Sequence, residues 1–336
     1  MSDSVIRFDR LTTHFRVKNL KELLARARQR AGLRVRAVTD LSFEVRRGEI
    51  MGFLGPNGAG KSTTIRTLMG LIHATSGAAY LMGEQVPARH ARERVGFLPE
   101  SPYFYDFLTA TELCDLVGRL YGLDHATRKR RAGELLDRVG LGDARARRLR
   151  TFSKGMLQRA GLAQALMNDP DVVVLDEPMS GLDPIGRKEV RDLIISLRDA
   201  GKTVFFSTHI LSDLELICDR VAIIVGGKLR DVGPLSRLLS PKSTHTESVL
   251  RARDPEGASA LAGAAGWTDV VGARTRVVED EAFITLPEGA DVDAYLASAH
   301  SHRAAVVSVT PRKESLEDLF LREVESAGVK GAGDRA

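Results

Sequence analysis

A glycine-rich octapeptide, Gly55–Ser62, constrains the fold of this chain more than any other feature of its sequence. It fits the phosphate-binding pattern G-x-x-x-x-G-K-[S/T] at every fixed position. The apolar run Ile50–Leu54 before it predicts a buried strand, and a helical pattern starts at Ser62. The alternative is a glycine-rich turn that matches by chance. Such a turn would not require a strand before it and a helix after it.

The octapeptide supplies the groups that a bound triphosphate needs. Its glycines let backbone N–H groups turn inward around a phosphate, and the following helix N-terminus adds positive charge. Lys61 can reach the β- and γ-phosphates, and the Ser62 hydroxyl can bind Mg²⁺. We therefore expect a nucleotide site formed by Gly55, Pro56, Asn57, Gly58, Ala59, Gly60, Lys61, Ser62 and Thr63.

The composition excludes some classes of protein. No stretch approaches the roughly 18 apolar residues of a membrane span, so we expect that the chain forms no pore by itself. Residues 1–10 lack the pattern of a signal peptide. The two cysteines, Cys114 and Cys218, lie far apart without metal-ligand spacing, which favours free thiols in a reducing compartment.

The net charge of +5 is concentrated in two arginine-rich segments, Arg16–Arg36 and Arg128–Arg150. Such segments can bind phosphates of nucleic acid or of lipid head groups, or they can be solvated surface. In the first segment, Leu20, Leu23 and Leu24 recur at helical spacing among basic residues. This pattern predicts a short amphipathic helix, which rests on a membrane or partner surface or packs on its own domain.

Apolar strands alternate with helical patterns through the first two thirds of the chain. The strands are predicted at Val172–Leu175, Val204–Ser207 and Val221–Val225. Runs of this kind are typical of an α/β fold with a mostly parallel sheet covered on both faces. A mostly helical stretch, Thr109–Arg150, is interrupted at Gly122 and Gly140.

The pattern changes after the linker-like segment Ser240–Ser243. The predicted order is strand, helix, strand, strand, helix, strand, which is the ferredoxin-like order of a small α+β domain. The elements are expected at Thr246–Ala252, Glu256–Ala265, Val270–Val278, Ala282–Leu286, Val292–His300 and Ala304–Thr310. A closing helix is expected at Leu316–Val324.

The apolar strand Val172–Leu175 ends in two acids, Asp176 and Glu177. Ligands gather at the carboxyl ends of parallel strands, so these acids are expected near the phosphate loop. Asp176 is suited to hold Mg²⁺, and Glu177 to activate a water that attacks the γ-phosphate.

Together these motifs resemble the ATP-binding cassette (ABC) ATPases, over residues 5 to about 239. Phe152–Arg159 is similar to the family's signature loop, and Ser180–Asp183 to its D-loop. Ser207-Thr208-His209 is similar to its switch histidine, and Glu100 stands at the Q-loop position. The C-terminal part, with Ser315–Phe320, resembles less specifically the accessory domain of such ATPases in export systems.

The resemblance implies a nucleotide held between two ATPase chains. One chain would supply Lys61 together with Glu177 and His209 as catalytic groups, and Ser62, Asp176 and Glu100 for Mg²⁺. The facing chain would supply its signature residues Ser153, Lys154, Gly155 and Met156, and Asp183 of the D-loop would lie near the seam.

Three positions depart from the family pattern. Lys154 and Met156 replace the commoner glycine and glutamine of the signature, and Glu100 stands where glutamine is usual. The aromatic residue that stacks on adenine is displaced by the basic insertion, and Phe15 is the candidate, with ordinary packing as the alternative.

The expected protein is the nucleotide-binding subunit of an ABC exporter, with ATP and Mg²⁺ as cofactors. The resemblance implies a homodimer beneath separate permease subunits, peripheral at the cytoplasmic face of the inner membrane, with no nucleic acid bound. The aromatic segment Glu100–Leu108 would contact the permease or belong to the core.

The expected domains are an ABC ATPase (1–239) with a helical subdomain (about 100–165) and a basic insertion (16–36), an accessory domain (244–326) and a tail (327–336). The alternatives are an ABC ATPase that acts on nucleic acid or the ribosome, and a nucleotide-gated regulator.

Overall fold

The computed structural model describes residues 3–16, 34–238, 243–252, 273–279, 281–301 and 304–313. The chain divides into two compact units, with the boundary between Leu235 and Ser236. Several sequence predictions fall outside the described residues: the amphipathic basic helix, the linker at 240–242, the helices at 256–265 and 316–324, and the tail.

A six-stranded sheet forms the centre of the first unit, in the order β10-β9-β3-β8-β7-β6. All neighbouring strands are parallel except β10, which pairs antiparallel with β9 at the edge. The inner strands are apolar runs buried on both faces, as expected for a parallel sheet between layers. The strands are β3 (Ile50–Leu54), β6 (Val95–Leu98), β7 (Val172–Asp176), β8 (Thr203–Thr208), β9 (Arg220–Val225) and β10 (Lys228–Pro234).

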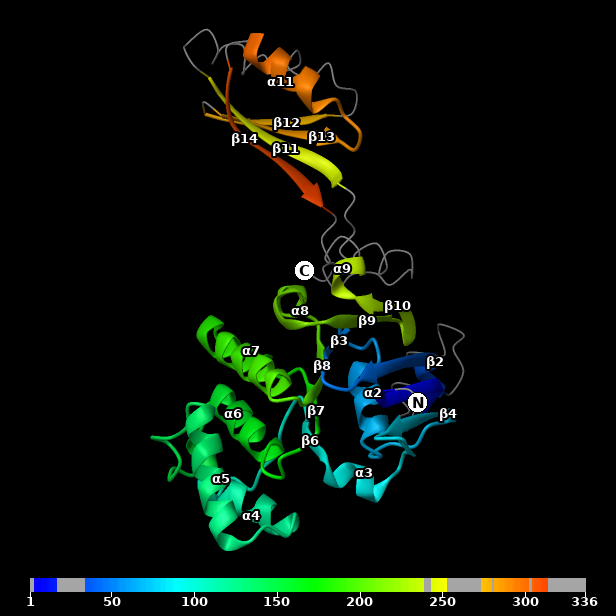
Figure 1. Cartoon of the computed structure of the whole chain (residues 1–336), viewed down its shortest axis with the longest axis vertical. Coiled ribbons are helices and arrows are strands. Elements are labelled where there is room, and N and C mark those ends of the chain that lie inside the picture. Colours follow the sequence, from blue (N-terminus) through cyan, green and yellow to red (C-terminus); the bar gives the residue numbers. More distant parts are fainter. Residues whose placement is uncertain are drawn as a thin grey trace. The chain divides into compact units, whose positions relative to one another are not determined.

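Helices cover both faces of this sheet. Helix α2 (Lys61–Leu68) contacts β7 from one side, whereas α7 (Pro184–Asp199) and α8 (Leu211–Ile217) pack on β3 and β8 from the other, as Figure 1 shows. The first unit also contains the short helix α3 (Arg89–Glu93), and the short helix α9 (Leu235–Leu238) spans the boundary between the two units. The expected α/β layering is confirmed.

A second, antiparallel sheet packs over α2, in the order β2-β1-β4-β5. Its strands are β1 (Ser4–Arg16), β2 (Arg34–Arg46), β4 (Ser76–Leu81) and β5 (Glu84–Gln85). Strands β1 and β2 pair with each other as far as Arg16 and Arg34. The ends of the predicted insertion 16–36 therefore belong to strands.

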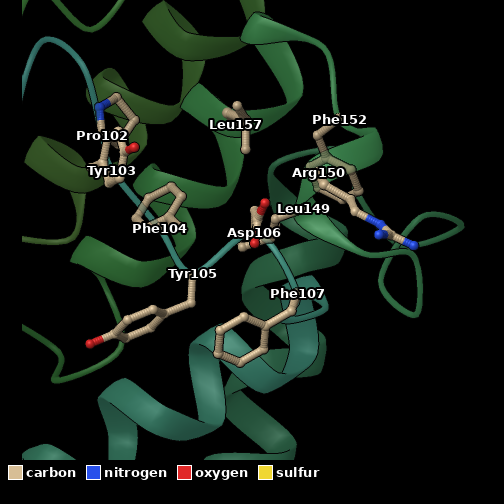
Figure 2. Close-up of a pocket in the computed structure, with 10 residues that line it drawn as sticks. All are labelled: Pro102, Tyr103, Phe104, Tyr105, Asp106, Phe107, Leu149, Arg150, Phe152 and Leu157. Atoms are coloured by element: carbon tan, nitrogen blue, oxygen red, sulfur yellow. The ribbon is translucent and has the colours of Figure 1, made fainter.

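The helical part of this unit contains α4 (Ala110–Leu120), α5 (His125–Arg138), a 3₁₀ turn (Leu149–Thr151) and α6 (Lys154–Ala165). Helix α4 begins in a capping box, in which Thr109 and Glu112 bind each other's backbone N–H groups. Gly122 and Gly140 have left-handed φ angles of 74° and 69° where α4 and α5 end. An aromatic-rich connection between β6 and α4 lines a surface hollow (Figure 2).

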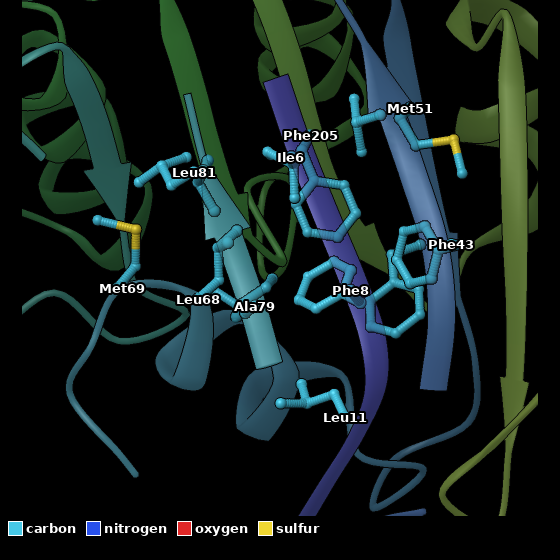
Figure 3. Packing of buried hydrophobic residues seen from close by; sticks show 14 of the residues in the cluster. Ile6, Phe8, Leu11, Phe43, Met51, Leu68, Met69, Ala79, Leu81 and Phe205 are labelled. Atoms are coloured by element: carbon cyan, nitrogen blue, oxygen red, sulfur yellow. The ribbon is translucent and has the colours of Figure 1, made fainter. Parts of the chain in front are cut away.

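The main hydrophobic core lies between the two sheets, as Figure 3 shows. Phe205 of the central strand β8 is fully buried, with its ring centroid 5.7 Å from that of Phe53 and 6.1 Å from that of Phe43. Phe8 of β1 lies 4.7 Å from Phe43. Four aromatic rings from both sheets therefore join the layer that carries the phosphate loop to the layer above it.

The second unit contains an antiparallel sheet in the order β12-β13-β11-β14, which is the order of the ferredoxin-like fold. Its described elements are β11 (Ser243–Ala252), β12 (Arg274–Val278), β13 (Glu281–Pro287), α11 (Val292–Ser301) and β14 (Ala304–Lys313). Alternating residues of β13 face a small core with Leu250 and Tyr295. Within the described ranges of both units, no helix is long and apolar enough to cross a bilayer.

We predict that Phe205→Ala lowers the free energy of unfolding of the first unit by about 3–5 kcal/mol, because it leaves a cavity among three rings. Urea titration followed by circular dichroism would measure the change. Leu120→Ala, at an exposed position of α4, is the control and should shift stability by no more than about 0.5 kcal/mol. A small loss for Phe205→Ala would contradict the packing described.

Candidate functional site

The phosphate loop connects β3 to α2 in a shape that requires its glycines. Gly58 and Gly60 have φ angles of 80° and 109°, which residues with a side chain rarely adopt. A Cβ atom at Gly60 would also lie 2.5 Å from the Ala37 carbonyl oxygen, and one at Gly55 would lie 2.5 Å from the Ile224 carbonyl oxygen. The loop is therefore held closely between β2 and β9 and leads directly into the N-terminus of α2.

Lys61 places a buried positive charge under this loop. Its Nζ donates to the Gly55 carbonyl over 2.6 Å and lies 3.1 Å from Glu177 Oε1. Both side chains are about 95% buried, with exposed fractions of 5% and 6%. A buried cation that faces a glycine-rich loop is suited to bind an anion.

Asp176, at the end of β7, connects three segments. Its Oδ1 accepts one hydrogen bond from Ser62 Oγ at 3.2 Å and another from Ser207 Oγ at 2.7 Å. The Ser62 hydroxyl and the Asp176 carboxylate are hard oxygen donors of the kind that Mg²⁺ prefers. The described ranges contain no cluster of three or more His, Cys, Asp or Glu side chains that could enclose a metal. The two oxygen donors of Ser62 and Asp176 fit Mg²⁺, an ion that usually keeps several waters and binds phosphate oxygens as well.

Glu177 has an unusual backbone conformation and bridges two other site residues. Its φ is 51°, in the left-handed region, and its N–H donates to the carbonyl and hydroxyl oxygens of Ser207 at 3.2 and 3.0 Å. Its Oε2 lies 2.8 Å from His209 Nδ1, while Oε1 faces Lys61 and accepts no hydrogen bond from the described residues. Such strain at a buried carboxylate is typical of functional sites.

The strand order explains why these residues meet. Strands β3, β8 and β7 are parallel neighbours, so the loop after Leu54, His209 after Thr208, and the acids at 176–177 lie at one edge of the sheet. The loop and Glu177 border a cavity of about 290 Å³, whereas Asp176 and His209 do not belong to its lining. Its lining contains Arg36, Ala37, Asn57, Gly58, Gly60, Lys61, Ser62, Thr63, Glu100 and Glu177.

Of the two residues Glu100 and Phe15, both predicted to lie at the nucleotide, only Glu100 lines the cavity. Glu100, just beyond β6, is exposed and lines the cavity. Phe15 does not belong to the lining, and 38% of its surface is exposed. Its role in stacking on adenine stays a prediction.

The sequence interpretation missed Arg36 and Ala37, which line the cavity, because it assigned residue 36 to the insertion. It also gave no role to the Ser207 hydroxyl, which donates to the Asp176 carboxylate and accepts from the backbone N–H of Glu177. The alternation Val35, Ala37 and the apolar run from Val38 could have indicated that the strand starts earlier.

The signature residues form a second group, outside this cavity. Ser153 is the N-cap of α6 and accepts a hydrogen bond from the Met156 N–H at 3.3 Å. The Lys154 side chain lies against Gly181, and Gly155 lies against Leu182. Gln158 Nε2 donates to the Pro178 carbonyl at 3.2 Å, which ties α6 to the residue that follows Glu177. Asp183 caps α7 by accepting from the Gly186 N–H.

The cysteines do not take part in this chemistry. Burial raises the pKa of the Cys114 thiol to about 12 and also raises the pKa of Cys218 well above its ordinary value. Both thiols therefore stay protonated at neutral pH and are poor nucleophiles.

Comparison with known proteins agrees with this geometry. Residues 38–180 match the family model described as ABC transporter. An uncharacterised ABC transporter ATP-binding protein of Synechocystis is 43% identical over 88% of this chain and 80% of its own length. The linearmycin resistance ATP-binding protein of Bacillus subtilis is 34% identical over 84% of this chain and 92% of its own length. A daunorubicin/doxorubicin resistance ATP-binding protein of Streptomyces peucetius is 41% identical over 65% of this chain and 66% of its own length.

Solved structures show the same fold. An ATP-binding subunit of an ABC transporter is 29% identical and matches with a TM-score of 0.60, over 70% of this chain and 92% of its own. A bacterial ABC transporter cassette solved as a dimer matches with a TM-score of 0.61 over 68% of this chain and 98% of its own. At 22% identity, the second match shows the fold alone.

We predict that Glu177→Gly is more stable than Glu177→Ala by about 1 kcal/mol. Alanine, like glutamate, has a Cβ atom that makes the left-handed φ energetically unfavourable, whereas glycine does not. Both variants lose the same carboxylate, so its contacts cancel in the comparison. Urea titrations without nucleotide would measure the difference.

The matched control is Glu134→Gly against Glu134→Ala in the middle of α5, where the order should reverse by about 1 kcal/mol. Equal stability of the two Glu177 variants would mean that the backbone at this position is not strained.

Proposed function

Since this chain belongs to the ABC transporter family as an ATP-binding subunit that hydrolyses ATP, we propose that it drives export through separate membrane subunits. The hydrolysis of ATP in this proposal rests on one observation. Glu177 contacts both Lys61 and His209 beside the phosphate loop. Export is supported by the names of relatives that act in resistance to linearmycin and to daunorubicin and in Nod factor export.

In this proposal the phosphate loop and Lys61 bind the β- and γ-phosphates of ATP. The ammonium group of Lys61 now faces Glu177, so an arriving phosphate would replace the carboxylate as its partner. Ser62 and Asp176 would hold Mg²⁺, which supplies positive charge to the phosphate oxygens when bound. Glu100, which also lines the cavity, would act on this metal through water.

Glu177 would then act as the general base. A water oxygen attacks the γ-phosphorus while its proton passes to the carboxylate, and the bond to the leaving oxygen of ADP breaks. His209, at 2.8 Å from Glu177, would hold the carboxylate and orient the water. Ser207 fixes the backbone N–H of Glu177, and so positions the base.

The signature residues suggest a homodimer. Ser153 and Lys154 are exposed and lie outside the cavity of their own chain, so a second copy can bring them to the nucleotide. The Ser153 hydroxyl and the N–H groups at the start of α6 would donate to the γ-phosphate, with Gly155 and Met156 in the first turn. Lys154 and Asp183 would lie at the seam between the copies.

The hollow drawn in Figure 2 is a suitable contact for the membrane subunits. Its volume is about 450 Å³, and Tyr103, Tyr105 and Phe107 beside it are largely exposed. The rings of Tyr105 and Phe107 lie 5.6 Å apart and form one apolar surface. Exposed aromatic groups favour docking over the core alternative, because they dominate the energy of many interfaces. The chain would then be peripheral at the cytoplasmic face of the inner membrane.

The alternative function, on nucleic acid or the ribosome, has less support. Several arginines of the segment 128–150 are already paired within the chain, such as Arg128 with Asp115 and Arg145 with Asp137. Arg131 donates to two backbone carbonyls.

We assign the ABC ATPase domain to 1–239 and an accessory domain, for dimer support or regulation, to 244–326.

Glu177→Gln should abolish most ATP turnover and trap an ATP-bound dimer, because the amide cannot accept the proton of the attacking water. Phosphate release and light scattering after size exclusion, with MgATP and with MgADP, would measure both effects. The control Glu134→Gln, on the exposed face of α5, should behave like the parent. Turnover of Glu177→Gln at the parent rate would show that Glu177 is not the base.

The double variant Tyr105→Ala/Phe107→Ala should recover about tenfold less of the membrane subunits in a pull-down, because it removes two exposed anchors. ATP hydrolysis by the isolated chain should remain unchanged. Leu120→Ala removes an exposed apolar side chain elsewhere on the helical part and should bind normally. Full recovery by the double variant would place the permease contact elsewhere.

A further inference from the structure

The wall of the nucleotide cavity on the side of β2 is held rigidly against the phosphate loop. The Gly227 N–H donates to the Ala59 carbonyl at 3.0 Å, and the Thr39 N–H donates to the Gly227 carbonyl at 2.7 Å. A Cβ atom at Gly227 would lie 2.7 Å from the Ala37 carbonyl oxygen, so the β9–β10 turn fits closely over the strand. The backbone that carries Arg36 and Ala37 is therefore fixed relative to the loop.

Arg36 is a charged wall residue without an assigned role. It is exposed, it lines the cavity, and its guanidinium makes no ion pair or hydrogen bond with the rest of the described chain. The next residue, Ala37, also lines the cavity.

The strand order places Arg36 at the opposite end of the cavity from the catalytic acids. From β3, the sheet continues through β9 to β10 on one side, and through β8 and β7 to β6 on the other. Arg36 and Ala37 adjoin the β9–β10 turn, whereas Glu177 and Glu100 follow β7 and β6. If the γ-phosphate lies at Glu177, the base of the nucleotide lies toward Arg36.

The register of the first hairpin separates Arg36 from Phe15. Strands β1 and β2 pair His14 with Arg36, and Phe15 with Val35. Opposite residues share a face and successive residues alternate, so Phe15 and Arg36 are on different faces of the hairpin. The arginine lines the cavity and the phenylalanine does not.

We infer that Arg36 is the residue that recognises the base, with its planar guanidinium stacked on the adenine ring of ATP. Arginine stacks on aromatic planes, whereas the ammonium group of lysine is a compact point charge that does not stack. This inference rests on the proposed nucleotide site and adds a specificity residue to it. It does not involve Arg36 in the chemistry at the γ-phosphate.

The test compares binding of MgATP with binding of magnesium tripolyphosphate, which has the phosphates but no base. Calorimetry on the full chain would give dissociation constants for the parent, Arg36→Ala, Arg36→Lys and Phe15→Ala. We expect Arg36→Ala and Arg36→Lys to bind MgATP about fivefold to tenfold more weakly. Their affinity for tripolyphosphate should stay within about twofold of the parent, and Phe15→Ala should bind both ligands like the parent. Unchanged thermal melting without ligand would show that the variants are folded.

Three results would overturn the inference. Equal weakening of both ligands by Arg36→Ala would make Arg36 a phosphate contact. Unchanged affinity of Arg36→Ala for MgATP would remove it from the site, and selective loss of ATP affinity in Phe15→Ala would assign the base to Phe15. Failure of the parent to bind MgATP would instead contradict the nucleotide site itself.

Discussion

The ion pair between Lys61 and Glu177 is the interaction on which the site depends. It joins the phosphate loop after β3 to the acid after β7, across the central strand β8, over 3.1 Å. Because both groups are almost fully buried, neither can lose its partner without a large cost, of about 3–5 kcal/mol for a buried pair. A ligand that replaces Glu177 at the lysine must therefore bring negative charge of its own. This requirement favours anions such as phosphates, and in the proposed mechanism it frees the carboxylate to act on water.

Much of the fold could be predicted because its signals are local. The phosphate loop, the apolar runs of β7, β8 and β9, and the breaks at Gly122 and Gly140 are each visible in a few successive residues. The lengths of β1 and β2 depend instead on long-range pairing, which no short run of residues reveals. The placement of Arg36 and Phe15 depends on a register shift between Thr13 and His14, and a shift of one residue exchanges the two faces of a strand.

The site shows the same division between local and long-range information. The residue types of the loop and of Asp176-Glu177 were predictable from the motifs, because chemistry restricts which side chains can bind phosphate and metal. The bonds of Ser207 to both acids and the left-handed backbone of Glu177 were not, since both arise only when β7 and β8 align. The exposure of Tyr103, Tyr105 and Phe107 was also open, because an aromatic cluster has the same sequence pattern in a core and on a surface.

The hydrogen bond from Gln158 to the Pro178 carbonyl has a consequence for the proposed dimer. It is buried and links helix α6, which begins at Ser153, to the residue next to the catalytic carboxylate. In the proposed dimer, a displacement of Glu177 would therefore be transmitted to the start of α6, which would face the neighbouring copy. The state of one nucleotide site would thereby affect the surface that its chain presents to the other copy.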